Sequence, residues 1–208
     1  MSKISLALAD WWTEPEANNV IDTSVKYEGT GSLKQTSPED TWTHAVCLHP
    51  DAVGVVDGKM EIYLRRSIEK AWFHITFRNV FDPGSPTPVT NCYRLLLRCF
   101  PSVSSPNFYL YLFRDDTQVD YTSYGDYMAW QTGQWCKLII EWKTTPDGKL
   151  RVDWYQENPG ADYYGTLIDP ENWYTDPTNL RIGLHSYNVV ADNTIHWDYL
   201  VLYKYFKI

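Results

Sequence analysis

The sequence lacks an excess of positive charge. Its 208 residues include 18 Lys and Arg against 26 Asp and Glu, so the formal net charge is −8 and the pI is about 5.0. No polybasic run and no zinc-finger or RNA-binding pattern interrupts this acidic background. Nonspecific binding to nucleic acid depends on Lys and Arg side chains that neutralise phosphates. We therefore predict that nucleic acid is not a partner.

A long apolar run is also missing. No stretch approaches the roughly 20 apolar residues that a membrane-spanning helix needs. The start of the chain, MSKISLALADWW (1–12), has a short apolar part and no cleavage site. The sequence therefore predicts neither a membrane span nor a signal peptide. We expect a protein of the extracellular space or of a virion surface, made without export or excised as a mature domain.

Paired cysteine motifs are absent. The four cysteines, Cys47, Cys92, Cys99 and Cys136, are widely spaced and form no CxxC motif. Cys92 and Cys99 lie seven residues apart on one expected strand, so they point to opposite sides of it and cannot pair there. We interpret the four cysteines as buried free thiols. The alternative is one or two disulfides.

The common catalytic signatures are missing as well. There is no G-x-S-x-G, H-E-x-x-H, P-loop or EF-hand sequence. The five histidines are scattered, so a zinc site would need distant strands to bring them together. These absences favour a protein without catalytic activity.

Alternation of apolar and other residues fills most of the chain instead. In 58–66, Met60, Ile62 and Leu64 alternate with Glu61, Tyr63 and Arg65, as expected for a half-buried antiparallel strand. The same period of two recurs in 71–80, 91–100, 107–115, 134–143 and 148–157.

Turn signals separate these runs. The sequence TPDG (145–148) predicts a tight hairpin, because an Asp-Gly pair tolerates a left-handed backbone. Pro- and Gly-rich turns are expected at 82–88, 101–107 and 157–162, and only 67–71 resembles a single helical turn. We predict an all-β protein of ten or more antiparallel strands, with residues 1–208 forming one β-sandwich domain.

Two stretches resemble a known superfamily. One is the turn Gly31-Ser32-Leu33-Lys34 followed by Trp42, within 18–45. The other combines the hairpin of 132–157 with the closing strands of 179–205. Both resemble jelly-roll carbohydrate-binding modules and concanavalin A-like (laminin G-like) domains. The resemblance implies a jelly-roll β-sandwich, a fold that serves lectins, glycoside hydrolases, polysaccharide lyases and viral structural proteins alike.

The glycosidase version of this sandwich carries Glu-x-Asp-x-x-Glu on one strand, so that two carboxylates flank the glycosidic bond. That pattern is absent here. Asp153 and Glu157 share a strand face but lie four residues apart, which argues against a retaining glycosidase.

Arginine, histidine and aromatic residues occupy the positions that alternate with the apolar ones. Such a face suits an anionic or planar ligand, because the Arg guanidinium forms bidentate hydrogen bonds with a carboxylate or sulfate and aromatic rings stack on sugars. One alternative is a solvated face of cross-strand pairs. Another is that the strands divide between two sheets and place these residues on opposite sides. The candidate ligand-binding residues are Tyr63, Arg65, Trp72, His74, Arg78, Arg94, Arg98, Arg151, Tyr155, Arg181, His185 and Tyr187.

Asp198 is a candidate metal ligand. In the modules that this chain resembles, an Asp of the last strand often helps to hold a structural Ca²⁺, which prefers oxygen ligands. The resemblance implies Asp198 as a ligand, with Asp22 or Glu28 as its partner. The alternative is that Asp198 hydrogen-bonds the neighbouring turn.

Three functions follow from this reading. The first is noncatalytic recognition of a polysaccharide or glycan, neutral or anionic, by stacking rings with Arg and His as hydrogen-bond donors. The second is a structural role in a virion or other assembly, with protein subunits as partners. The third is a polysaccharide lyase, in which a Tyr or His removes a proton beside a uronate and a positive group holds the carboxylate.

Overall fold

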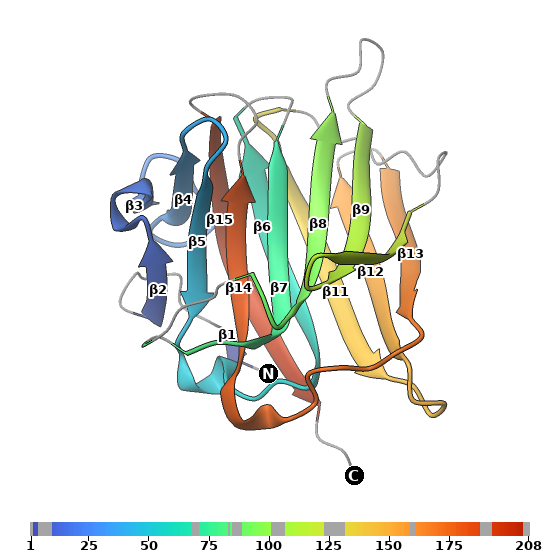
Figure 1. The fold of residues 1–208 in the computed structure, drawn as a ribbon. Coiled ribbons are helices and arrows are strands. Elements are labelled where there is room, and N and C mark those ends of the chain that lie inside the picture. Colours follow the sequence, from blue (N-terminus) through green and yellow to red (C-terminus); the bar gives the residue numbers. More distant parts are fainter. Residues whose placement is uncertain are drawn as a thin grey trace.

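The protein is a sandwich of two antiparallel β-sheets that face each other (Figure 1). The computed structural model describes residues 2–3, 10–67, 71–82, 84, 89–100, 107–122, 132–158, 161–187 and 193–205. Much of the predicted turns at 82–88, 101–107 and 157–162, and the centre of the expected helical turn at 67–71, lie outside these residues.

Sheet A has the strand order β13-β12-β11-β6-β15-β4-β3, and β1 pairs with β15. Its strands are β1 (Ser2–Lys3), β3 (Asn19–Asp22), β4 (Ser32–Ser37), β6 (Asp57–Arg66), β11 (Trp135–Thr144), β12 (Leu150–Asn158), β13 (Ala161–Asp169) and β15 (Asn193–Tyr205). The predicted hairpin at 145–148 joins β11 to β12.

Sheet B has the order β10-β9-β8-β7-β14-β5-β2. Its strands are β2 (Trp11–Glu14), β5 (Trp42–Cys47), β7 (Trp72–Val80), β8 (Tyr93–Phe100), β9 (Asn107–Arg114), β10 (Thr117–Tyr121) and β14 (Leu180–Tyr187). The last two strands of the chain therefore belong to different sheets, so the closing segment 179–205 is not a hairpin within one sheet.

Short 3₁₀ turns are the only helices in the described part of the chain. They are η2 (Glu16–Asn18), η3 (Pro50–Ala52) and η4 (Pro177–Asn179). Within the same residues, no helix is long and apolar enough to cross a membrane.

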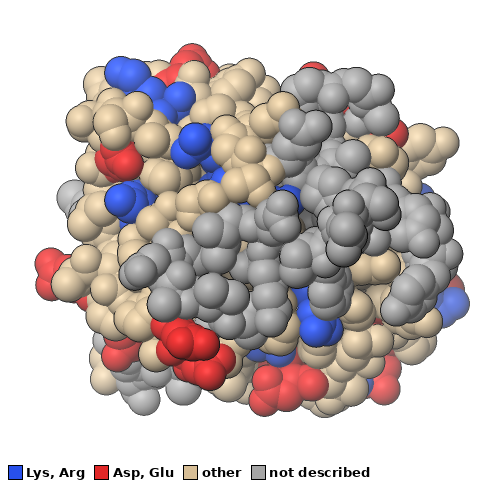
Figure 2. All heavy atoms as spheres, turned by 90° about the horizontal axis from the view of Figure 1, so that it is seen from above, with Lys and Arg blue, Asp and Glu red and all other residues tan. Residues whose placement is uncertain are grey.

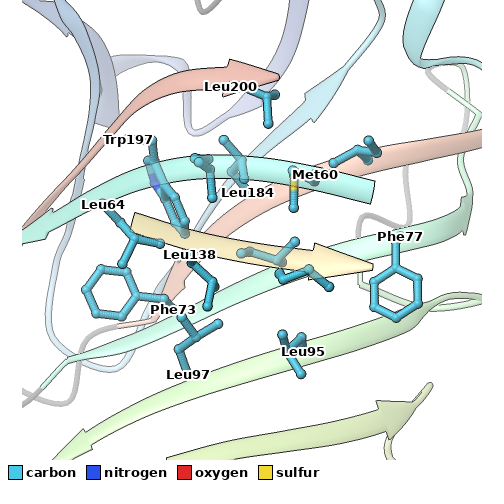
Figure 3. Packing of buried hydrophobic residues seen from close by; sticks show 14 of the residues in the cluster. Met60, Leu64, Phe73, Phe77, Leu95, Leu97, Leu138, Leu184, Trp197 and Leu200 are labelled. Carbon is cyan, nitrogen blue, oxygen red and sulfur yellow. The ribbon is translucent and has the colours of Figure 1, made fainter. Parts of the chain in front are cut away.

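The core lies between the sheets and is built from the alternate side chains that the sequence pattern picked out. In β11, for instance, Cys136, Leu138, Ile140 and Trp142 are all fully buried. Figure 3 shows how residues of both sheets interdigitate, with Leu138 and Trp197 from sheet A against Phe73 and Leu97 from sheet B. Burying each such side chain stabilises the fold by roughly 1.5–3 kcal/mol.

The four cysteines are all buried and free, as predicted, and three of them, Cys47, Cys99 and Cys136, belong to the core. Burial raises the pKa of each thiol, that of Cys47 and that of Cys99 to about 12. At neutral pH the cysteines are therefore protonated, and they pack as small apolar side chains.

A polar bridge crosses this core beside β14. The Trp197 indole donates to Gln35 Oε1 over 2.9 Å, and the Gln35 amide donates to the carbonyl of Leu184 over 3.1 Å. Since Trp197 and Gln35 belong to sheet A and Leu184 to sheet B, this buried and satisfied amide fixes the spacing of the two sheets at that point.

Candidate functional site

The outer face of sheet B, which points away from the core, carries most of the polar and aromatic side chains of that sheet. On β7, Phe73, Ile75 and Phe77 lie in the core, so Trp72 and His74 point outward. Strand register then aligns outward side chains into rows that run across the sheet.

Two such rows are central. The ring row consists of Trp42 of β5, Tyr187 of β14 and Trp72 of β7. The histidine row, next to it, consists of His44, His185 and His74 of the same three strands. On β8 the ring row continues into Arg98, whose guanidinium lies 4.7 Å from the Trp72 ring centroid.

Two residues of the histidine row, His44 and His185, are linked by a hydrogen bond, and His185 also meets Thr76. Asn79 Nδ2 donates to Thr76 Oγ1 over 3.2 Å, and this hydroxyl lies 3.0 Å from His185 Nε2. We assign the Thr76 hydroxyl as the donor to His185 Nε2, which places the His185 proton on Nδ1, 3.1 Å from His44 Nδ1. In this assignment His44 carries its own proton on Nε2.

Gly183 makes room for this arrangement. A Cβ atom at position 183 would lie 2.3 Å from His185 Nε2 and 2.4 Å from Thr76 Oγ1. The His185 ring thus leans over the glycine to reach the threonine, and any larger residue at 183 would break their hydrogen bond.

Burial keeps the three imidazoles neutral. Desolvation lowers the pKa of His44 to about 4 and holds the pKa of His74 and of His185 well below the usual value. The positive charge of Arg94 on β8 acts in the same direction on His74 and His185.

The Trp42 indole covers the histidine row. Its centroid lies 4.5 Å from that of His74, 5.5 Å from that of His44 and 5.2 Å from that of Tyr187. The guanidinium of Arg94 lies 5.9 Å from the same indole. As a result, His74 and His185 are buried although they belong to an outer face, whereas the three rings of the ring row stay partly exposed.

The structure thus brings six of the predicted ligand-binding residues together on one face: Trp72, His74, Arg94, Arg98, His185 and Tyr187. Sequence reasoning missed Trp42 and His44. The signal that could have found both residues is the alternation within WTHAVC (42–47). Thr43 and Ala45 are buried, so Trp42 and His44 point to the other side of the strand.

Four predicted residues lie elsewhere, on the outer face of sheet A. They are Tyr63 and Arg65 of β6 and Arg151 and Tyr155 of β12. The expectation of a single polar face is therefore wrong, because the strands divide between two sheets.

Arg181 belongs to sheet B but lies apart from the two rows. It lies at the start of β14, before an irregularity in the pairing with β7, and donates to the carbonyl of Leu180.

Arg78 is not on an outer face at all. Between Thr76 and Asn79, β7 has one more residue than the opposing segment of β14, which is a β-bulge, and Arg78 has φ +47°. The bulge turns its side chain out of the alternation and buries it completely. It donates to the Asp57 carboxylate at 2.7 Å and to the Val56 carbonyl at 2.6 Å, so it ties β7 to sheet A.

Two of the three predicted calcium ligands, Asp198 and Asp22, serve as hydrogen-bond acceptors. Asp198 accepts the backbone N–H groups of Tyr27, Glu28 and Tyr199 at 2.7–3.1 Å. Asp22 accepts those of Ser24 and Val25, the Ser24 hydroxyl and the His196 ring. N–H groups aimed at these oxygens repel a cation, so the carboxylates do not fit Ca²⁺, and Asp198 bonds the neighbouring turn, as the alternative held.

Chelation tests this conclusion. We expect EDTA to leave the melting temperature unchanged, and 5 mM CaCl₂ to leave it unchanged too, because Asp22 and Asp198 already have their donors. Differential scanning calorimetry of the same sample with either addition measures this. A rise of several degrees with calcium, reversed by EDTA, would contradict it.

Comparison with known proteins gives relatives in structure only. No protein-family model matches the sequence, and no curated protein is similar to it. Among solved structures, the VIP36 exoplasmic/lumenal domain in its Ca²⁺/Man3GlcNAc-bound form is 10% identical, with a TM-score of 0.61 over 97% of this chain and 86% of its own. Arcelin-5, a lectin-like defence protein from Phaseolus vulgaris, is 9% identical, with a TM-score of 0.60 over 95% and 93%.

A mutant of the alginate lyase Aly36B in complex with alginate trisaccharide is also similar. It is 13% identical, with a TM-score of 0.56 over 96% of this chain and 89% of its own. At such identities the likeness concerns the fold. It confirms the resemblance found in the sequence: this chain has the concanavalin A-like jelly-roll fold of the lectins and lectin-like proteins.

Proposed function

We propose that this protein binds a glycan on the outer face of sheet B without cleaving it. The observation that carries the proposal is the ring row. Tyr187 lies 5.2 Å from Trp42 and 5.4 Å from Trp72, centroid to centroid, so three partly exposed rings form one continuous platform. Aromatic rings offer an apolar surface to the C–H faces of sugars, and neighbouring polar groups orient the ligand.

The hydrogen-bond donors beside the platform support the proposal. In the proton assignment given above, His44 presents Nε2–H beside the platform, and Arg98 lies over the Trp72 ring. An oriented N–H group and a guanidinium next to stacked rings suit the hydroxyl and ring oxygens of a sugar.

The geometry of Tyr187 and His44 gives little support to the lyase. A lyase needs a tyrosine or histidine poised to remove a proton, beside a cation. The hydroxyl of Tyr187 lies 3.2 Å from the Asp40 carboxylate, to which it donates, and Nδ1 of His44 is occupied by His185. In the proton assignment given above, the remaining His44 nitrogen carries a proton and is a donor rather than a base. These contacts concern Tyr187 and His44, and His74 beside Arg94 keeps the lyase as the second candidate.

An assembly role receives less support from the surface. Its sign would be a broad apolar patch of more than a few hundred Å². The large apolar side chains that are exposed among the described residues lie on separate elements: Val20 and Ile21 on β3, Tyr27 in a turn, Val80 on β7, Tyr121 on β10, Tyr164 on β13, Trp173 after β13 and Tyr205 on β15.

A glycan array with the purified protein, with light scattering on the same sample, tests the function. We expect selective binding by a monomer, and a loss of affinity of about tenfold or more in Trp72→Ala and in Tyr187→Ala, as for a central aromatic anchor. Trp72→Phe, which keeps a ring, should recover part of the affinity.

The matched control is Tyr164→Ala. This tyrosine is 80% exposed on β13, in the other sheet, and should bind like the wild type. Unchanged melting temperatures would show that the variants are folded. Absence of binding to every glycan, together with a defined oligomer, would refute the proposal in favour of a structural assembly protein.

A further inference from the structure

Charge is unevenly distributed on this acidic protein. The net charge is −8, yet the four adjacent strands β14, β7, β8 and β9 contain no Asp or Glu. On the outer face of sheet B, β8 carries Arg94 and Arg98. Figure 2 looks down on one end of the sandwich, and the acidic side chains seen there lie chiefly around its rim. Adjacent strands that carry arginines and no carboxylates, on an acidic protein, are complementary to an anionic ligand.

Arg94 is a buried cation with little to neutralise it. It is 7% exposed and lies between two rings, 4.9 Å from the Phe113 centroid and 5.9 Å from that of Trp42. Its ion pair with Asp116 spans 3.5 Å, and the Asp116 side chain is 88% exposed, so solvent weakens it. Within the described residues, Nε of Arg94 has no hydrogen-bond partner. Burying a guanidinium so incompletely paired is costly.

His74 is a second buried group without partners. It is 3% exposed, and neither of its ring nitrogens has a hydrogen-bond partner in the described part of the chain. It lies on β7, diagonal to Arg94 on β8, since Thr76 pairs with Arg94 and His74 with Leu96. Both side chains contact the same Trp42 indole.

We infer that the glycan carries an acidic group, a carboxylate or a sulfate, and that this group binds to Arg94 and His74 once the Trp42 ring turns aside. The inference rests on the proposed function and names its ligand class. An anion between these two side chains would supply the acceptor that the guanidinium and the imidazole lack, while the sugar rings lie along the ring row. Arg94 then determines specificity for charge, and Trp72 and Tyr187 supply stacking.

Paired ligands that differ only in charge test the inference. Isothermal titration would compare an oligogalacturonide with its methyl ester, and a sulfated galactan oligosaccharide with its desulfated form, alongside neutral mannan and galactan oligosaccharides. We expect an acidic ligand to bind at least about tenfold more tightly than its neutral form, in a salt-dependent manner. The two acidic ligands distinguish carboxylate from sulfate.

Variants assign the effect to residues. In Arg94→Gln the ratio of affinities for the acidic and the neutral form should fall to less than about threefold. His74→Gln should reduce the preference in the same direction. Arg151→Gln, which removes an exposed arginine of sheet A, should leave it unchanged.

The outcomes separate the two proposals. Equal binding of the acidic and neutral forms, or tight binding of neutral oligosaccharides alone, would overturn the inference and leave glycan binding intact. A charge preference that survives in Arg94→Gln would overturn the assignment to Arg94. Failure of every ligand, on the array and in titration, would overturn the proposed function itself.

Discussion

Replacing Arg78 with methionine should lower the free energy of unfolding by about 3–5 kcal/mol, the usual result of breaking a buried ion pair from one side. The Arg78 guanidinium is fully buried, and Nη2 donates to Asp57 at 2.7 Å and to Thr144 Oγ1 at 3.0 Å. Nη1 donates to Asn172 and to the carbonyl of Trp173. Methionine fills similar space but leaves these acceptors, a carboxylate among them, without their donor.

Urea unfolding at pH 7 measures this loss, and Arg151→Met is the control. Arg151 also pairs with a carboxylate, that of Asp153 at 2.8 Å, but its side chain is 45% exposed. Exposed pairs of this kind contribute about 0–1 kcal/mol. Similar losses in the two variants would show that burial of Arg78 adds nothing to its ion pair, contrary to our account of how β7 is tied to sheet A.

The same arginine shows what a sequence pattern leaves out. Period-two alternation correctly predicted the strands that became β6, β7, β8, β9, β11 and β12, because a strand with one buried face must alternate. Alternation also placed Arg78 outward, with Trp72 and His74. A β-bulge of one extra residue reverses the direction of the Arg78 side chain. The sequence AWFHITFRNV (71–80) contains no signal that predicts this bulge.

The histidine row illustrates a second limit. His44 and His185 are 141 residues apart in sequence, and they hydrogen-bond because β5 lies next to β14. Strand alternation predicts which side chains point outward, but only the strand order tells which of them meet. The sequence therefore predicted His74 and His185 as site residues without His44, the hydrogen-bond partner of His185. It also assigned Tyr63 and Arg151 to the same site, although they belong to the other sheet.

Arg94 and the histidine row share one environment, because the Trp42 ring lies next to both. The rings of Trp42 and Phe113 exclude water from Arg94, and the same Trp42 ring excludes water from His74. Without water, a neutral imidazole is strongly favoured over its protonated form next to a cation. The arrangement is thus prepared for an added negative charge and poorly suited to an added positive one.

Acidification should therefore destabilise the fold steeply below pH 6.5. An unfolded imidazole takes up its proton near pH 6.5, whereas the pKa of His44 in the fold is about 4, and burial holds the pKa of His74 and of His185 well below the usual value. Between these values the unfolded state binds more protons, so the free energy of unfolding falls as pH falls, by up to about 1.4 kcal/mol per pH unit for each histidine. His44 alone should contribute about 3 kcal/mol by pH 4.

Urea unfolding at intervals from pH 7.5 to 4.5 measures this slope, above the range in which most carboxylates titrate. His44→Gln and His74→Gln should each make the slope shallower by about 1.4 kcal/mol per pH unit below pH 6, because glutamine takes up no proton in either state. Equal slopes in the wild type and in the variants of the histidine row would mean that these imidazoles are hydrated and take up protons as in the unfolded chain. The Trp42 ring would then not exclude water from them, contrary to the structure.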